Sequence, residues 1–228
     1  MARLPRIEIA GIAQHVIQRG VDRMPCFVDD YDRKFYLHSL KQARDKNTCR
    51  IHAYVLMTNH VHLLVTGEEV GNISAMMQSL GRRYVRHFNY RHDRTGTLWE
   101  GRFKSNLVDS DQYVLTCYRY IEMNPVRAGI VDNPSKYRWS SIHANAKGME
   151  DILVDPHPVF QHLGSEDHQR KTKYQVLLAH VIRSQEIKAI RDHVNQGKPL
   201  GSTKFQNKIA ELIGRPVELM PMGRPQNK

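Results

Sequence analysis

The stretch Met57-Thr58-Asn59-His60-Val61-His62-Leu63-Leu64-Val65 places two histidines on either side of one valine, in a run rich in β-forming residues. Because side chains alternate along a strand, His60 and His62 point to one face and Val61 to the other. Two neighbouring imidazoles supply half of a metal site. With 13 histidines in 228 residues, one His-x-His triplet is about what chance gives, so the pair needs partners elsewhere in the chain.

The surrounding sequence predicts a sheet with packed helices. Residues 13–19 and 50–57 have the composition of strands, and the polar turn Thr58-Asn59 makes 50–66 a hairpin or a bent strand pair. Apolar residues at three- and four-residue steps predict helices over about 29–46 and 73–88. A further helix is expected to begin at Asp109-Ser110-Asp111 and to stop before Pro125.

The helix expected over 109–123 contains a second group of polar residues. At about 100° per residue, Asn124 lies about 40° from Tyr120 but about 120° from Tyr118. Tyr120 is therefore the preferred nucleophile and Tyr118 the alternative, while Glu122 is expected at the surface. Two imidazoles and one amide oxygen would leave open positions on a divalent ion, as catalytic sites do.

Charge and composition indicate the kind of partner. Lys and Arg number 34 against 23 Asp and Glu, a net charge of +11, which favours nucleic acid or another anionic surface. Three cysteines without Cys-x-x-Cys spacing indicate neither a disulfide framework nor a cysteine zinc site, so a cytoplasmic location is expected. No run of 18 apolar residues occurs, so we expect no membrane association.

Several basic and aromatic side chains are candidates for contact with nucleic acid. Basic residues cluster in a turn after the first strand, on the second helix and around residues 98–104, where aromatic residues could stack on unpaired bases. A merely solvated basic face is the alternative for the helix, and a core position is the alternative for Trp99. The candidates are Arg19, Arg23, Arg82, Arg83, Arg86, Trp99, Arg102, Phe103, Lys104 and Arg127.

The combined motifs resemble a known family. His60-Val61-His62, followed by Tyr120-Ile121-Glu122-Met123-Asn124-Pro125-Val126-Arg127-Ala128-Gly129, is similar to the single-tyrosine HUH transposases of bacterial insertion sequences. Among these it most resembles the transposases associated with repetitive extragenic palindromes (REPs). The likeness covers about residues 8–145 and includes the segment 98–104.

This resemblance implies an α+β fold with a ferredoxin-like antiparallel sheet, the HUH endonuclease core. It implies that His60, His62 and Asn124 bind Mg²⁺ or Mn²⁺, and that Tyr120 attacks single-stranded DNA beside a hairpin. The products would be a 5′-phosphotyrosine and a free 3′-hydroxyl. The expected partners are hairpins of imperfect palindromes, and the expected protein is a monomer or homodimer in the bacterial cytoplasm, associated with the nucleoid.

The chain is expected to have two parts. Residues 1–148 would form the catalytic domain, and residues 149–228 a mainly helical, basic C-terminal extension outside the resemblance. In the extension, helices are predicted over about 166–182, 185–195 and 203–213. Its last dozen residues are expected to form a disordered basic tail.

Three other functions remain open at this stage. A domesticated nuclease would use the same chemistry on genomic hairpins without moving its own gene. A catalytically dead DNA- or RNA-binding protein would keep its function after Tyr120→Phe. A metal-dependent hydrolase, with Tyr120 in the core, would release both DNA ends free.

Overall fold

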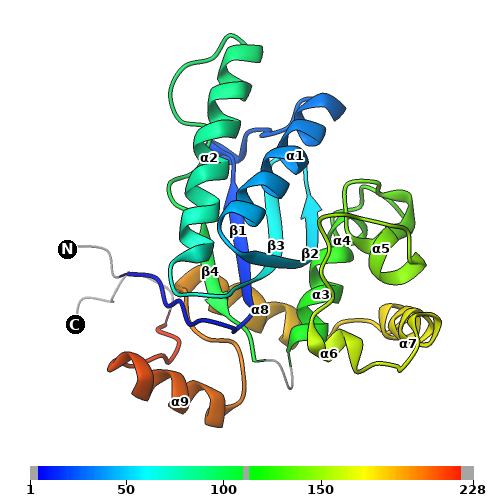
Figure 1. The fold of residues 1–228 in the computed structure, drawn as a ribbon. Helices are drawn as coiled ribbons and strands as arrows, with labels where there is room; N and C mark the ends of the chain where they lie inside the picture. Colours follow the sequence, from blue (N-terminus) through cyan, green and yellow to red (C-terminus); the bar gives the residue numbers. More distant parts are fainter. Residues whose placement is uncertain (1–4, 110–112, 222–228) are drawn as a thin grey trace.

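The computed structural model describes residues 5–109 and 113–221, and a four-stranded antiparallel sheet lies at its centre (Figure 1). The strands β1 (Gln14–Arg19), β2 (Cys49–Leu56), β3 (His60–Gly67) and β4 (Lys104–Leu107) have the spatial order β2-β3-β1-β4. β2 and β3 pair as a hairpin. Helices α1 (Asp30–Lys46) and α2 (Asn72–Arg91) complete a βαββαβ order, which confirms the ferredoxin-like α+β fold.

Different helices cover the two faces of the sheet. α1 and α2 pack together on one face (Figure 1), where Gln18 of β1 lines a cleft with residues 74–81 of α2. Because β1 and β3 alternate in register, His60 and His62 point to the opposite face. That face is covered by α3 (Val114–Glu122), which contacts β2 and β3.

Sequence signals explain where the first helices form. The side chain of Asp29 accepts hydrogen bonds from the backbone N–H groups of Tyr31 and Asp32, and so caps the start of α1. α2 buries the apolar residues that were predicted to form its inner face, namely Ile73, Met76, Met77, Leu80, Tyr84 and Phe88. The two helices predicted before residue 100 are therefore confirmed.

The helix predicted from Asp109 begins later than expected. α3 starts at Val114, and the Asp109 carboxylate accepts hydrogen bonds from the backbone N–H and hydroxyl of Ser202; Ser110 and Asp111 lie outside the described residues. α3 ends before Pro125, as predicted. One more turn, α4 (Asn124–Arg127), follows at once, since a proline in the first turn of a helix removes no hydrogen bond.

The C-terminal extension is helical and packs against the same core. The extension begins after the 3₁₀ turn η2 (Pro134–Lys136) and the short helix α5 (Ile142–Lys147). A second 3₁₀ turn, η1 (Val21–Arg23), lies directly after β1. The helices of the extension are α6 (Pro158–Gln161), α7 (Asp167–Ala179), α8 (Ser184–Gln196) and α9 (Thr203–Ile213). Phe160, Tyr174 and Ile190 are buried in the main core. The three helices predicted here are present, and α8 contacts β4, β1 and α3.

The beginning of the expected tail is packed rather than free. Val217 is buried in a small second cluster with Ile7 and Ile209. The backbone N–H of Met220 donates to the Gln196 side chain, 2.8 Å away. Because these contacts hold residues 217–220, the prediction of a disordered tail was wrong for this segment. The rest of that prediction, residues 222–228, lies outside the described residues.

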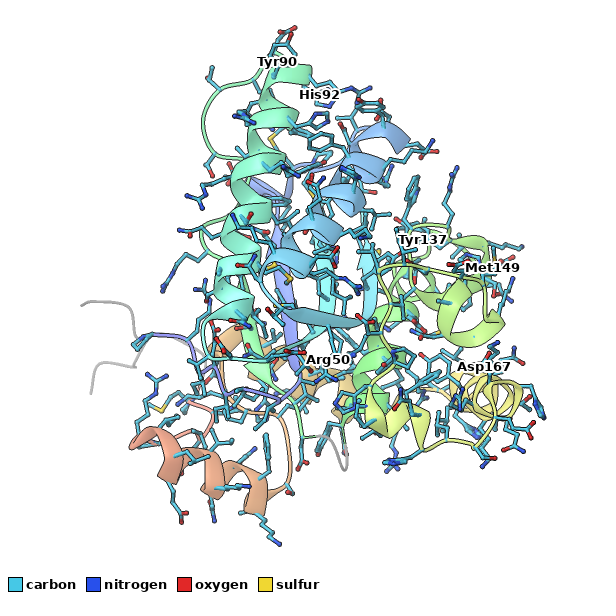
Figure 2. The ribbon with its side chains drawn as sticks, viewed as in Figure 1. Arg50, Tyr90, His92, Tyr137, Met149 and Asp167 are labelled. Atoms are coloured by element: carbon cyan, nitrogen blue, oxygen red, sulfur yellow. The ribbon has the colours of Figure 1, made fainter. Side chains whose placement is uncertain are left out.

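Figure 2 shows Tyr90 and His92 at the far end of α2, at the top of the view, and Met149 and Asp167 at its right, near α5 and α7. Within the described ranges, no helix is both long and apolar enough to cross a lipid bilayer.

Candidate active site

Strand β3 brings the two histidines of the His-x-His motif together on the face beneath α3. His62 is buried and His60 is half-buried, and their ring centroids are 5.0 Å apart. Asn59, in the hairpin turn, orients His60: its amide oxygen lies 2.6 Å from Nδ1 of His60, and its amide nitrogen donates to the carbonyl of Arg23. An amide oxygen only accepts hydrogen bonds, so Nδ1 of His60 carries the hydrogen and Nε2 is left for another ligand.

A third histidine, which sequence reasoning missed, completes this group. His15 of β1 is fully buried, and its Nε2 lies 2.9 Å from Nδ1 of His62. The two rings are stacked, with centroids 5.1 Å apart. His15 lies on the same face because β1 pairs Ile17 with His62, and His15 is two residues from Ile17. The only signal in the sequence was the position of one histidine at an alternate site of the first strand.

All three imidazoles are held in their neutral form by burial. Burial, followed by the nearby Arg127, lowers the pKa of His15 to about 3. Burial and then Arg19 lower the pKa of His60 to about 4. Burial also places the pKa of His62 well below its usual range, with further contributions from the neighbouring His15 and His60 rings and from Arg127 and Arg19. Neutral imidazoles are the form that binds metal ions.

Tyr120 of α3 lies directly over the histidines. Its ring centroid is 5.7 Å from His62 and 5.7 Å from His15, and its ring is edge-on to both. Tyr118, the alternative nucleophile, points elsewhere: it is fully buried, stacks on Phe160 and accepts a hydrogen bond from the backbone N–H of His157. Side chains two positions apart in a helix point about 200° away from each other, so Tyr118 and Tyr120 lie on different sides of α3.

Arg127 of α4 lies against Tyr120. Its guanidinium carbon is 4.2 Å from the centre of the Tyr120 ring, and Nη2 donates to the Tyr120 carbonyl at 2.6 Å. Nε and Nη1 of Arg127 are buried and have no hydrogen-bond partner among residues 5–109 and 113–221. Burial, followed by the nearby Arg191 of α8, lowers the pKa of Arg127. Two strong donors beside Tyr120 are therefore buried and unsatisfied in the described part of the chain. We call His15, His60, His62, Tyr120 and Arg127 the Tyr120 cluster.

Asn124 is the first residue of α4, one turn after Tyr120, and is 9% exposed. In the described part of the chain, no group of three His, Cys, Asp or Glu side chains is arranged to hold a metal ion. A metal at this site would therefore depend on two histidines and on an oxygen donor that is not a carboxylate. An amide oxygen of Asn124 has the required chemistry.

Glu122, expected at the surface, is fully buried. Its carboxylate accepts hydrogen bonds from Ser141 at 2.6 Å, Asn145 at 2.7 Å and Tyr174 at 2.6 Å. Burial raises the pKa of Glu122 to about 7, although these donors oppose the shift. The helical wheel gave no sign of this position because its partners come from α5, α7 and the turn before α5. We call these four residues the Glu122 cluster.

The predicted DNA-contacting residues are divided by the sheet. Arg19 pairs with His60 in the β1–β3 ladder, and Arg23 is exposed in the turn that Asn59 contacts. The side chains of Arg82, Arg83 and Arg86 are exposed on α2, the helix on the opposite face of the sheet. They therefore form a surface separate from the Tyr120 cluster.

The four predicted residues around the start of β4 differ in how far they are exposed. Trp99 is only 6% exposed and packs against Tyr84, with ring centroids 5.9 Å apart, so the core alternative holds and this ring is not free to stack on a base. Phe103 is half-buried under the guanidinium of Arg6, whereas Arg102 and Lys104 are exposed.

Comparison with known proteins identifies the class of protein. Residues 9–124 match the family model described as "Transposase IS200 like", which covers half of the chain and includes β1 to α3. The chain belongs to this family.

Two further comparisons show which kind of family member the chain is similar to. The chain is 25% identical over 136 residues, 55% of its length, to a Haemophilus influenzae protein described as a REP-associated tyrosine transposase, of which 77% is covered. A solved structure of a REP-associated tyrosine transposase bound to a REP hairpin has a similar fold, with a TM-score of 0.56 and 19% identity. The match covers 69% of this chain and 93% of that one.

Proposed function

We propose that this protein is a site-specific endonuclease and strand transferase for single-stranded DNA, with Tyr120 as its nucleophile. The observation that carries the proposal is the placement of the Tyr120 ring over His15 and His62 and against Arg127. Membership of the IS200-like transposase family supports a DNA-processing reaction. The described relatives support a hairpin beside the cleaved bond as the substrate.

The residues present fit a divalent metal, for which we propose Mg²⁺ or Mn²⁺. His60 and His62 would bind through Nε2, because their Nδ1 atoms face Asn59 and His15. His62 would then donate from Nδ1 to Nε2 of His15, and Asn124 would supply the third ligand. Such hydrogen bonds fix the orientation of metal-binding histidines. When bound, the ion would polarise the scissile phosphate and stabilise its developing charge.

The reaction that we propose is transesterification at phosphorus. The Tyr120 oxygen loses its proton and forms a bond to phosphorus, while the bond from phosphorus to the 3′ oxygen breaks. The 3′ oxygen gains a proton, so the products are a 5′-phosphotyrosine and a free 3′-hydroxyl. Arg127 would donate to the phosphate oxygens through Nε and Nη1, which have no partner in the described part of the chain. Attack by another 3′-hydroxyl reverses the step and joins a new strand.

A denaturing-gel assay tests this function. The protein is incubated with Mn²⁺ and a panel of 3′-labelled single-stranded hairpins from the DNA that flanks its gene, because the label then stays on the strand joined to the protein. We expect a slowly migrating covalent adduct with the natural chain and with Tyr118→Phe, and none with Tyr120→Phe. Free ends without an adduct would instead indicate a hydrolase. Binding of the hairpins that is unaffected by Tyr120→Phe, with no cleavage by any variant, would indicate a binding protein.

A further inference from the structure

Two clefts meet at the outer edge of β4. The first, of about 460 Å³, is lined by residues 5–7, 102–105, 194–198 and 215–216. The second, of about 480 Å³, lies between β1 and residues 74–81 of α2. Both clefts include Arg6, Arg102 and Phe103 in their walls, so they adjoin at the edge of the sheet. We call the two clefts together the β4 groove.

The C-terminal extension builds one wall of the β4 groove. Residues 194–198 are the last turn of α8 and the two residues after it, and residues 215–216 follow α9. Arg215 donates to the carbonyl of Pro5, and Lys198 donates to the carbonyl of Pro216. In Figure 1 the N-terminal segment runs beside the segment after α9 at this edge. Most of this wall therefore lies outside the region that matches the family model, residues 9–124.

The lining of the β4 groove is strongly basic. Five cationic side chains line its first cleft, and no carboxylate of the described residues lines either cleft; the five are Arg6, Arg102, Lys104, Lys198 and Arg215. The hydrogen bonds of Lys104, Lys198 and Arg215 end on neutral oxygen atoms. Because these partners carry no negative charge, the groove keeps its positive potential for an anionic ligand.

Two residues that line the groove each have a buried polar atom without a partner. Ser105, 6% exposed, lines the first cleft with its hydroxyl buried, and Gln18, 8% exposed, lines the second with its amide oxygen buried. Neither atom has a hydrogen-bond partner within the described ranges. Buried polar atoms are usually bonded, so these two indicate a surface that a polar ligand completes.

The groove lies close to the Tyr120 cluster. Lys104 of β4 pairs with Ile17 of β1, and Ile17 pairs with His62 of β3. Two strand spacings separate Lys104 from His62, a backbone distance of roughly 10 Å. A strand held at the cluster can therefore continue into the groove.

We propose that the β4 groove binds the unpaired DNA strand that continues from the hairpin, so that the C-terminal extension serves as part of the DNA-binding surface. The cations would hold phosphates, and the stacked Arg6–Phe103 pair, with 3.7 Å between the guanidinium carbon and the ring centre, offers a flat surface to a base. The groove bends around the sheet edge, which a flexible single strand can follow and a stiff duplex cannot. The proposal rests on the proposed function for its substrate.

Binding measurements with a charge-matched control test the proposal. Lys198→Gln with Arg215→Gln removes two charges of the groove wall but keeps hydrogen-bond donors. Lys204→Gln with Lys208→Gln removes two exposed charges of α9 that do not line the groove. The probes are a labelled 12-nucleotide oligo-dT and a 12-base-pair dA·dT duplex, without metal, measured by fluorescence anisotropy at several salt concentrations.

We expect the groove variant to bind oligo-dT about tenfold more weakly with a shallower salt dependence, and to bind the duplex within twofold of the natural chain. The control variant should match the natural chain on both probes. Unchanged oligo-dT binding, equal loss on the duplex, or equal loss in the control variant would each overturn the proposal. If the double variant unfolds at a lower temperature, Lys198→Gln alone is used, with an expected threefold loss.

The outcome is separable from that of the proposed function. These measurements need neither metal nor cleavage, and the natural chain and Tyr120→Phe should bind oligo-dT equally. A protein without covalent chemistry could still pass this test. A protein that forms the Tyr120 adduct could still fail it.

Discussion

Helix α3 contributes to two buried polar clusters that differ in how completely their hydrogen bonds are made. In the Glu122 cluster, both carboxylate oxygens are bonded, by Ser141, Asn145 and Tyr174. In the Tyr120 cluster, Nδ1 of His15 and both Nε and Nη1 of Arg127 are buried without a partner in the described part of the chain. The two clusters lie two residues apart on one helix.

This difference separates a structural role from a functional one. A satisfied buried carboxylate joins the elements around it, and here it ties α3 to α5 and α7. Unsatisfied buried donors cost stability, and such costs are found where a ligand completes the site. We therefore expect substitutions in the Glu122 cluster to change stability, and substitutions in the Tyr120 cluster to change chemistry.

The largest effect should come from the proposed metal ligands. We expect His60→Ala combined with His62→Ala to reduce the rate of adduct formation by about three orders of magnitude or more, since charge stabilisation at the phosphate is lost. Electron paramagnetic resonance with hairpin present should show that the double variant binds one Mn²⁺ ion fewer than the natural chain. The control is His52→Gln, a buried histidine bonded to Thr66 and to the Asp155 carbonyl. Bound Mn²⁺ in the double variant would contradict this assignment.

Removing the Glu122 carboxylate should lower the stability of the fold, in contrast to substitutions in the Tyr120 cluster. Glu122→Ala removes the shared acceptor of three buried donors. Ser141 and Asn145 keep the carbonyls of Tyr54 and His52, but the Tyr174 hydroxyl is left without a partner in the described part of the chain. We therefore expect the free energy of unfolding to fall by about 3 kcal/mol in urea titrations. Glu122→Gln keeps an acceptor and should cost less. Tyr120→Phe, which removes only a hydroxyl, should change stability by about 0.5 kcal/mol or less. A loss below about 1 kcal/mol for Glu122→Ala would remove the distinction between the clusters.

His15 should strengthen metal binding by orienting the His62 ring. His15→Phe preserves a buried ring but removes the contact with Nδ1 of His62, so we expect Mn²⁺ affinity to fall about 10- to 100-fold. Binding of oligo-dT without metal should stay unchanged. Isothermal titration with Mn²⁺ measures the effect, and His15→Gln, which keeps a side-chain acceptor, should restore part of the affinity. Natural Mn²⁺ affinity in His15→Phe would show that His62 needs no orienting partner.

Acidification should destabilise the chain through its buried neutral histidines. Burial lowers the pKa of His52 and of His15 to about 3, against an ordinary value of 6.5. Between these values the unfolded chain binds protons that the folded chain does not. The free energy of unfolding therefore falls as pH drops below 6.5, by about 2 kcal/mol per histidine at pH 5.

Glu122 contributes with the opposite sign. Its pKa is raised from 4.5 to about 7, so the stability from its protonated form is full below pH 4.5 and is lost as pH rises to 7. Glu122→Gln removes this opposing effect, and the loss of stability from pH 7 to pH 5 should become steeper. Urea titrations at both pH values test this. Equal slopes in the two chains would show that Glu122 titrates at its ordinary pKa.

The sequence predicted what depends on local periodicity. Alternation in residues 60–65 identified the shared face of His60 and His62, and the helical wheel separated Tyr120 from Tyr118. The helices of the extension were predicted because their apolar spacing is regular. These features follow from geometry within one element.

Contacts between distant elements were not predictable in this way. His15 meets His62 only because β1 and β3 are neighbours in the sheet, 47 residues apart in the chain. Glu122 is buried because α5 and α7 pack over it, and Trp99 is buried against α2. The wall formed by residues 194–198 and 215–216 also depends on tertiary packing. No local pattern encodes these partners.

Identifying the residue joined to DNA tests the central claim most directly. The adduct formed with Mn²⁺ and a hairpin is treated with nuclease and trypsin, which cuts after Arg119 and Arg127 and so places Tyr118 and Tyr120 on different peptides. We predict that mass spectrometry finds a 5′-linked nucleotide on the peptide of residues 120–127, at Tyr120. A nucleotide on Tyr118 or on any other residue would contradict the account.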